Sequence, residues 1–203
     1  TKATAEGGLG WTASDYGFFS GSYGLINVFL LMLFFGGLIL DKLGIRFTGL
    51  LSASLMLAGV VIKYFAVSVD FGDAVFSISA LDFHLPMSAA VASLGFAIFG
   101  VGAEITGITI SKTITKWFTG HELAMAMGVQ VALARLGTAA ALGINLPLAK
   151  SFGLQLPVLV AICLLTIGLL CFMVYNVMDR KLDDSIAAVE GKNATEDSGK
   201  ENF

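Results

Sequence analysis

The sequence predicts an all-α membrane protein that crosses the bilayer several times, and three observations support this fold class. Apolar residues make up 56% of the 203 residues and charged residues only 13%, about half the charged share of a soluble domain. The chain contains 24 glycines, which suit membrane helices because small residues let helix backbones approach closely. Its few charges lie mostly between apolar stretches long enough to span the hydrocarbon core, which takes about 20 residues.

Five apolar stretches are candidate transmembrane helices, and they differ in the charges they contain. The first and fifth contain none, and the second carries Lys63 near its end, where an ammonium can reach the headgroups. The third contains Glu104 and the fourth Arg135. The predicted spans cover residues 16–40, 48–66, 87–110, 123–148 and 154–178. They form a transmembrane bundle within residues 1–182, and the polar residues 183–203 are expected to be a flexible cytoplasmic linker or tail.

The basic residues predict the orientation of these spans. If every span crosses, one side of the membrane collects most of them, and basic connections favour the cytoplasm. The opposite side includes the connection 69–88, whose charged residues are all acidic and whose residues 74–81 could form a short interfacial helix or a strand. The chain end is therefore predicted to be cytoplasmic. Because no sorting signal is visible in the sequence, the protein is predicted to be a multi-pass protein of the plasma (inner) membrane. The basic residues of the richer side are Lys42, Arg46, Lys112, Lys116, Arg180 and Lys181.

The connection between the first two spans contains a distinctive motif. Residues 36–46 read GGLILDKLGIR. Asp41 lies at the C-terminal end of a helix, where the helix dipole disfavours an acid, so it needs a partner elsewhere. Gly37 would allow close packing before it and Gly44 a tight turn after it. Lys42 and Arg46 mark the cytoplasmic face.

This motif resembles the signature loop between the second and third helices of the major facilitator superfamily. In that loop a glycine is followed four residues later by an aspartate, and then by a basic residue, a glycine and further basic residues. Ile45 departs from the pattern, because a basic residue often stands there. Other runs resemble the lysosomal dipeptide transporter branch, from which Val28 departs. These runs are SDYG (14–17), SYG (22–24) with Asn27, GVGAE (100–104), WF (117–118), ELA (122–124), GVQ (128–130) and ARLG (134–137).

The resemblance implies a particular architecture. It identifies the chain as the N-terminal helix bundle of a major facilitator superfamily transporter, with five of six transmembrane helices present. The first helix and the C-terminal six-helix bundle of the same protein would then be missing partners. By the same resemblance, Gly37, Asp41, Lys42, Gly44 and Arg46 form a conformational gating motif.

Two charges, Glu104 and Arg135, lie well inside predicted spans and need a physical explanation. A charge near a helix centre costs about 2.5–3.5 kcal/mol on insertion scales. At 1.5 Å per residue, Glu104 lies about 13 Å and Arg135 about 18 Å from the cytoplasmic surface. Adjacent antiparallel helices would therefore bring the two side chains within pairing distance. They form either a structural ion pair or a substrate site, and intramembrane ionisable groups favour a substrate site.

A zwitterionic solute fits such a site. Arg135 would bind its carboxylate through two parallel hydrogen bonds, and Glu104 would bind its ammonium group. The resemblance implies the same roles, because the dipeptide branch uses a central acid and arginine for the peptide termini. Asn27 lies about 20 Å above the cytoplasmic end of its helix, with Tyr23 one turn higher on the same face. These two side chains either line the cavity or bond to neighbouring helices.

The expected function is transmembrane transport of a dipeptide or other zwitterion by alternating access. The alternative is a proton-coupled organic anion (carboxylate) transporter, in which Arg135 binds the carboxylate and Glu104 couples protons. A membrane enzyme would show clustered His, Asp or Cys, a scaffold subunit would not need the Asp41 loop together with two buried charges, and a channel would show a filter-like repeat. The expected partners are a small-molecule substrate and the lipid bilayer; no cofactor, metal ion or nucleic acid is predicted.

Overall fold

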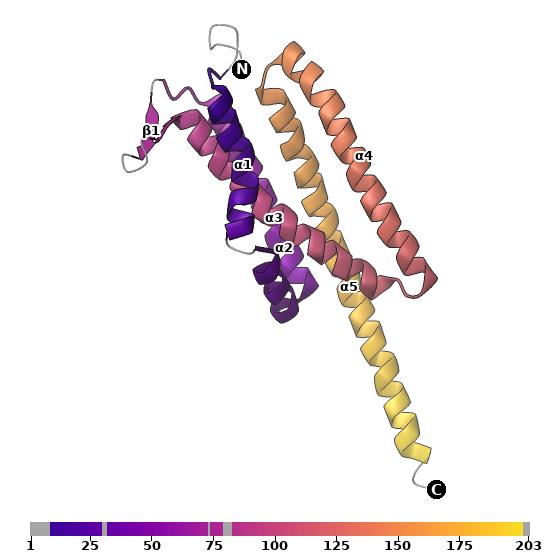
Figure 1. The fold of residues 1–203 in the computed structure, drawn as a ribbon. Helices are drawn as coiled ribbons and strands as arrows, with labels where there is room; N and C mark the ends of the chain where they lie inside the picture. Colours follow the sequence, from indigo (N-terminus) through magenta and orange to yellow (C-terminus); the bar gives the residue numbers. More distant parts are fainter. Residues whose placement is uncertain (1–8, 30–31, 73, 79–82, 201–203) are drawn as a thin grey trace.

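The computed structural model describes residues 9–29, 32–72, 74–78 and 83–200, and these are helical apart from one β-hairpin (Figure 1). The elements are α1 (Ala13–Phe29), α2 (Met32–Ser68), β1 (Val75–Ile78), β2 (Phe83–Pro86), α3 (Met87–Trp117), α4 (His121–Phe152) and α5 (Gln155–Lys200). In the described part, four helices are long and apolar enough to cross a membrane, within Leu33–Ser68, Met87–Trp117, His121–Phe152 and Gln155–Ala188. The predicted class, an all-α membrane protein, is confirmed.

The start of α1 is fixed by reciprocal capping and by a buried tryptophan. The backbone N–H of Thr12 donates to Asp15 Oδ2 at 2.8 Å, and the N–H of Asp15 donates to Thr12 Oγ1 at 3.2 Å. This exchange satisfies two N–H groups that a helix start leaves free. Trp11 Nε1 donates to Ser88 Oγ at 3.0 Å, and the indole is packed with Leu85 in a small hydrophobic core. The beginning of α1 is thereby attached to the beginning of α3.

The predicted first span, residues 16–40, is divided between two helices. Helix α1 ends at Phe29 and α2 begins at Met32, and residues 30–31 lie outside the described part. Helix α2 is itself interrupted at Gly44, whose φ of 78° and ψ of 170° are not helical. A positive φ is readily adopted by glycine because it has no Cβ. The connection predicted between the first two spans therefore falls inside α2, at this glycine.

The two parts of α2 run in opposite directions along α3. Along the first part of α2, later residues contact later residues of α3, so this part and α3 are parallel. Along the second part, later residues of α2 contact earlier residues of α3, so this pairing is antiparallel. The contacting pairs are Gly36 with Ile105 and Asp41 with Lys112 in the first part, and Ser52 with Gly102 and Gly59 with Gly95 in the second. The five predicted crossings are compatible with this arrangement, and their membrane boundaries stay predictions.

Glycines allow the second part of α2 and α3 to touch backbone to backbone. A Cβ placed on Gly59 would lie 2.5 Å from the carbonyl oxygen of Gly95, and a Cβ on Gly102 would lie 2.7 Å from that of Ser52. Side chains at these positions would force the helices apart. Small residues therefore set the closest helix–helix interface of the described structure, as they do in many membrane proteins.

The connection between α2 and α3 contains the β-hairpin. Strands β1 and β2 are antiparallel, with Val75 opposite Pro86 and Ile78 opposite Phe83. Of the two structures that residues 74–81 could adopt, the structure shows a strand at Val75–Ile78, and residues 79–81 lie outside the described part.

Helices α4 and α5 are packed more loosely than α1 to α3. Every residue of α4 is described and none is buried. Figure 1 shows α5 extending beyond the other helices towards the C-terminus. The segment predicted as a flexible tail from residue 183 is helical as far as Lys200, which differs from the prediction. Asp179 and Asp183 are held by basic residues of α2 and α3, which stabilises the first turns of α5 beyond the predicted span.

Candidate functional site

Three of the predicted site residues lie together where α1 packs against α3. The Tyr23 hydroxyl donates to Glu104 Oε1 at 3.3 Å. Asn27 Nδ2 donates to the backbone oxygen of Tyr23, one turn earlier, at 2.8 Å. Asn27 Oδ1 is buried and has no hydrogen-bond partner in the described part of the chain. These groups provide a carboxylate, a hydroxyl and a free amide oxygen in an otherwise apolar surrounding.

A glycine of α3 makes this arrangement possible. A Cβ on Gly100 would lie 2.7 Å from the backbone oxygen of Tyr23 and 2.9 Å from Asn27 Nδ2. Any larger residue would separate α1 from α3 and move Tyr23 away from Glu104. Gly100 therefore positions the polar residues of the site without contributing a functional group.

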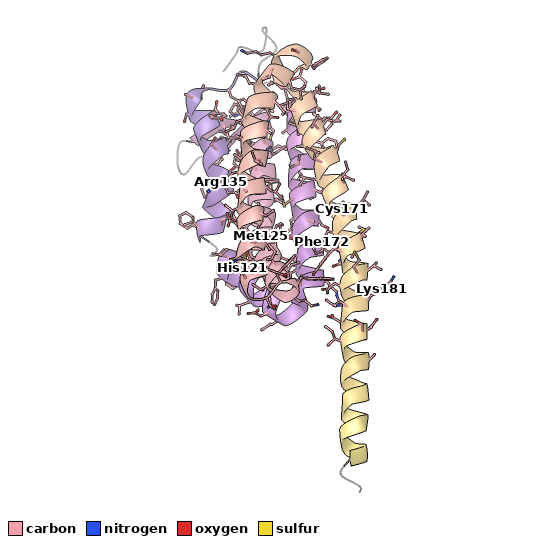
Figure 2. All side chains as sticks on the ribbon, turned by 90° about the vertical axis from the view of Figure 1, so that its right-hand side faces the viewer. His121, Met125, Arg135, Cys171, Phe172 and Lys181 are labelled. Carbon is pink, nitrogen blue, oxygen red and sulfur yellow. The ribbon has the colours of Figure 1, made fainter. Side chains whose placement is uncertain are left out.

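The fourth predicted residue, Arg135, lies apart from the other three. Its side chain is exposed on α4, and it forms no ion pair with Glu104 or any other described acid. Figure 1 shows α3 and α4 diverging from their short connection, and Arg135 is labelled on α4 in Figure 2. The pairing predicted from comparable membrane depths is thus not found, because the two helices are not adjacent at that depth. The predicted contact between Arg135 and the substrate stays a prediction.

The aspartate of the gating motif has the partner that its unfavourable position requires. Lys112 Nζ donates to Asp41 Oδ1 at 2.6 Å. Both side chains are largely in contact with solvent or lipid, with exposed fractions of 73% for Asp41 and 42% for Lys112. This ion pair links the end of the first part of α2 to the end of α3. Lys112, predicted to serve only orientation, is therefore also a structural contact.

One of the two motif glycines has the role predicted for it, and the other does not. A Cβ on Gly37 would meet no atom within 4 Å, so close packing is not its role in this structure. The preceding Gly36 has that role, since a Cβ there would lie 3.0 Å from Ile105 Cγ1. Gly44 makes the turn that the motif predicted. Lys42 is exposed beside it.

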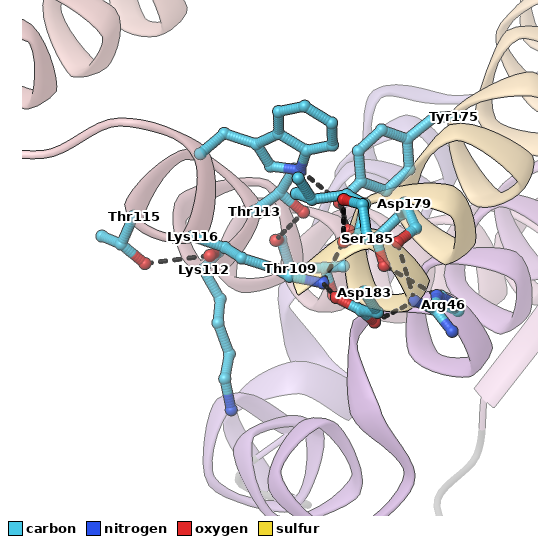
Figure 3. A network of polar contacts seen from close by, with 12 residues as sticks. Arg46, Thr109, Lys112, Thr113, Thr115, Lys116, Tyr175, Asp179, Asp183 and Ser185 are labelled. Atoms are coloured by element: carbon cyan, nitrogen blue, oxygen red, sulfur yellow. Dashed lines mark hydrogen bonds and ion pairs between the residues drawn. The ribbon is translucent and has the colours of Figure 1, made fainter. Parts of the chain in front are cut away.

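Arg46, the last basic residue of the motif, belongs to a network that joins α2, α3 and α5 (Figure 3). Its Nε donates to Asp179 Oδ2 at 2.7 Å, and its Nη2 donates to Asp183 Oδ2 and, at 3.0 Å, to the Asp179 backbone oxygen. Lys116 Nζ donates to Asp179 Oδ1 at 2.7 Å and to Asp183 Oδ1 at 2.8 Å. The Tyr175 hydroxyl donates to Asp179 Oδ1 at 3.1 Å.

Asp179 and Asp183 were missed by the sequence analysis, although a signal was present. Asp179 is buried, with 1% of its surface exposed, and it accepts hydrogen bonds from three different side chains. The two aspartates are four residues apart, directly after the uncharged fifth span, so they share one helix face. The intervening Arg180 and Lys181 were used only for orientation. In the described residues, no three His, Cys, Asp or Glu side chains are grouped to hold a metal ion.

Comparison with known proteins shows two similar curated sequences. The lysosomal dipeptide transporter MFSD1 of Danio rerio is 26% identical over 176 residues, which cover 80% of this chain and 34% of that protein. The lysosomal dipeptide transporter MFSD1 of Bos taurus is 29% identical over 110 residues, covering 54% of this chain and 20% of that protein. The chain thus spans only about a third of the length of the first of these relatives. No protein-family model and no solved structure matches it.

These similarities confirm the resemblance to transporters of the major facilitator superfamily. Together with the apolar helices, they identify the chain as part of a multi-pass membrane protein. The names of both relatives refer to the lysosome and give no support to the plasma membrane predicted from the sequence, so the membrane stays a prediction.

Proposed function

We propose that this chain forms part of a transporter that moves a dipeptide or a similar zwitterionic solute across a membrane by alternating access. One observation carries the proposal: 80% of the chain is similar to a curated dipeptide transporter. The similar region includes most of the membrane helices, where the polar groups that contact a solute would lie.

The Glu104 group is suited to the ammonium end of the solute. Its carboxylate accepts a hydrogen bond from Tyr23 and has further acceptor positions free for an ammonium. Asn27 Oδ1, buried without a described partner, is a second acceptor close by. Arg135 supplies the complementary cation, and its guanidinium, which has no described partner, can hold a carboxylate through two bonds.

The contacts at the predicted cytoplasmic end are suited to gating. Asp41 and Lys112 form a largely exposed ion pair between two helix ends, which can break and re-form at little cost. In the proposed cycle, the motif of Gly37, Asp41, Lys42, Gly44 and Arg46 stabilises one of the two access states, and the solute is released when these contacts change. A first helix and a C-terminal six-helix bundle, as the resemblance implies, would complete the pathway.

Uptake of a labelled dipeptide into proteoliposomes tests this proposal. The protein is used at the full length that its gene encodes, beside Arg135→Ala and Glu104→Gln, with Thr138→Ala on the exposed face of α4 as the matched control. Glutamine keeps an acceptor for Tyr23 but loses the charge, so Glu104→Gln is expected to fold. Because a hydrogen bond to a charged group contributes about 1.5–3 kcal/mol, each site variant should lower uptake at least about tenfold.

The outcomes separate the two candidate solutes. If both site variants fail and Thr138→Ala transports normally, a zwitterion site is supported. If Glu104→Gln still binds a carboxylate solute but no longer couples its uptake to a proton gradient, the organic anion alternative replaces it. If the unaltered protein neither transports dipeptides nor is inhibited by them, the proposal is wrong.

A further inference from the structure

Lys63, near the end of α2, is half-buried, and its ammonium lies over aromatic rings of the bundle. Its Nζ is 4.5 Å from the ring centroid of Phe96, 5.6 Å from that of Phe19 and 5.9 Å from that of Phe99. Aromatic faces attract cations, so three rings from α1 and α3 hold the ammonium in place. The sequence predicted that this side chain would reach the headgroups, which the structure does not show.

The position of Lys63 depends on a glycine. A Cβ on Gly95 would lie 3.0 Å from Lys63 Cγ, so the lysine side chain crosses α3 over the space that a larger residue would fill. The aliphatic stem is therefore fixed by the α2–α3 interface, and only the ammonium end faces the rings. A side chain held in this way is pre-positioned to bind a ligand.

The charge of Lys63 has no acidic partner in the described residues, where the acids that form ion pairs are Asp41, Asp179 and Asp183. An unpaired charge within a membrane protein is costly, and ring faces compensate for only part of that cost. Lysines in such positions usually have a functional role. A bound anion would compensate for the rest of the cost of the Lys63 charge.

Lys63 also lines an open pocket. This pocket has a volume of about 410 Å³ and is lined by residues of α2, α3, α4 and α5. Lys63 and Asn145 are its polar lining residues, and the others, including Val60, Phe99 and Leu164, are apolar. Apolar walls with a few polar groups are typical of pockets that bind small molecules, and this volume lies in their usual range.

We infer that this pocket is an entry subsite for the carboxylate group of the transported solute, with Lys63 as the charged ligand and Asn145 as a hydrogen-bond donor. This inference rests on the proposed function. Lys63 lies three residues before Ala66, so it is about 5 Å from the end of the predicted second span, on the side opposite the cytoplasm. Asn145 is ten residues from Arg135, or about 15 Å along α4. A carboxylate bound here would next reach Arg135, deeper in the membrane.

The first test measures uptake at varied dipeptide concentration for the full-length protein, Lys63→Met and Lys63→Arg. Methionine keeps an apolar stem on the rings, and arginine keeps the charge. Lys63→Met should raise KM about tenfold with little change in kcat, and Lys63→Arg should restore most of the affinity. Lys150→Met, which changes an exposed lysine of α4 on the same predicted side, should behave like the unaltered protein.

The second test asks whether the carboxylate is the recognised group. Inhibition by a free dipeptide is compared with inhibition by the same dipeptide amidated at its C-terminus. The unaltered protein should be inhibited more strongly by the free peptide than by the amidated one. In Lys63→Met, the ratio of the two inhibition constants should be about tenfold smaller. Asn145→Leu changes an exposed residue outside the ring cluster, so it tests the same pocket even if Lys63→Met does not fold; it should lose about threefold of the preference.

Each other outcome overturns the inference in a distinguishable way. If Lys63→Met and Asn145→Leu keep the KM and the preference of a protein that does transport, the subsite is wrong and the proposed function stands. If the unaltered protein transports no dipeptide, both are wrong. If the effect of Lys63→Met appears in vesicles containing anionic phospholipid and disappears in pure phosphatidylcholine, which is zwitterionic, the pocket binds an anionic lipid headgroup and not the solute.

Discussion

The α2–α3 pair and the α4–α5 pair have similar lengths and similar apolar character, but they pack very differently. The most apolar windows of α2 and α3 are 22% and 39% buried, whereas those of α4 and α5 are both 0% buried. A Cβ on Gly59 of α2 would collide with the backbone of α3, but a Cβ on Gly143 of α4 would meet nothing within 4 Å. In a bilayer, apolar surface does not by itself bring helices together, because lipid is equally apolar. Close backbone approach at small residues makes the difference.

The largest expected effect comes from filling the α2–α3 interface. Gly59→Leu should lower the free energy of unfolding by about 3 kcal/mol or more, because the new side chain has backbone atoms of Gly95 and Phe99 in its path. The same change at Gly143 should alter it by less than about 0.5 kcal/mol. Thermal unfolding and the yield of monodisperse protein in detergent are measured for both variants. Equal losses for the two variants would show that the α2–α3 contact is not special.

A polar network attaches α5 to α2 and α3. Asp179→Asn removes the charge that Arg46 and Lys116 share, and it should lower the free energy of unfolding by about 1–3 kcal/mol. The estimate is below that for a fully buried ion pair because the two cations are 32% and 29% exposed. Asp184→Asn, an exposed neighbour without an ion-pair partner in the described residues, should have almost no effect. If thermal unfolding shows the two variants to be equivalent, the network does not hold α5.

The same comparison explains which features the sequence could predict. Long uncharged stretches are visible in one dimension, so the fold class and approximate helix positions followed from hydropathy. The turn at Gly44 was also predictable, because a glycine after a helix-ending aspartate favours a positive φ. The sequence could not predict whether Gly36 or Gly37 packs against α3, because this depends on the rotation of α2 about its axis.

Contacts between distant residues were harder to predict than the helices themselves. Tyr23 and Glu104 meet because α1 and α3 are parallel neighbours, but Arg135, at a comparable predicted depth, is on a helix that diverges from α3. Depth in the membrane can be estimated from residue counts, whereas adjacency cannot, because weak amphipathic patterns do not show which helix faces another. Lys63 illustrates the same point: its position suggested the headgroups, and its neighbours hold it over aromatic rings.

The smallest expected effect concerns the exposed ion pair of Asp41 and Lys112, which joins the end of the first part of α2 to the end of α3. Asp41→Asn should change the free energy of unfolding by less than about 1 kcal/mol, since largely exposed ion pairs contribute little. A contact made in only one access state shifts the equilibrium between states by its own free energy, so dipeptide uptake should change by no more than about fivefold.

A double-mutant cycle shows whether this ion pair is the cause. Lys112→Gln should change uptake by the same factor as Asp41→Asn, and the double variant should be no worse than either single variant, because one interaction cannot be lost twice. Uptake and thermal unfolding are measured together for all three variants. If the fold-change in uptake of the double variant equals the product of the two single fold-changes, Asp41 acts through a group other than Lys112. An effect on unfolding as large as that of Asp179→Asn would mean that the motif holds the helices together and does not gate them.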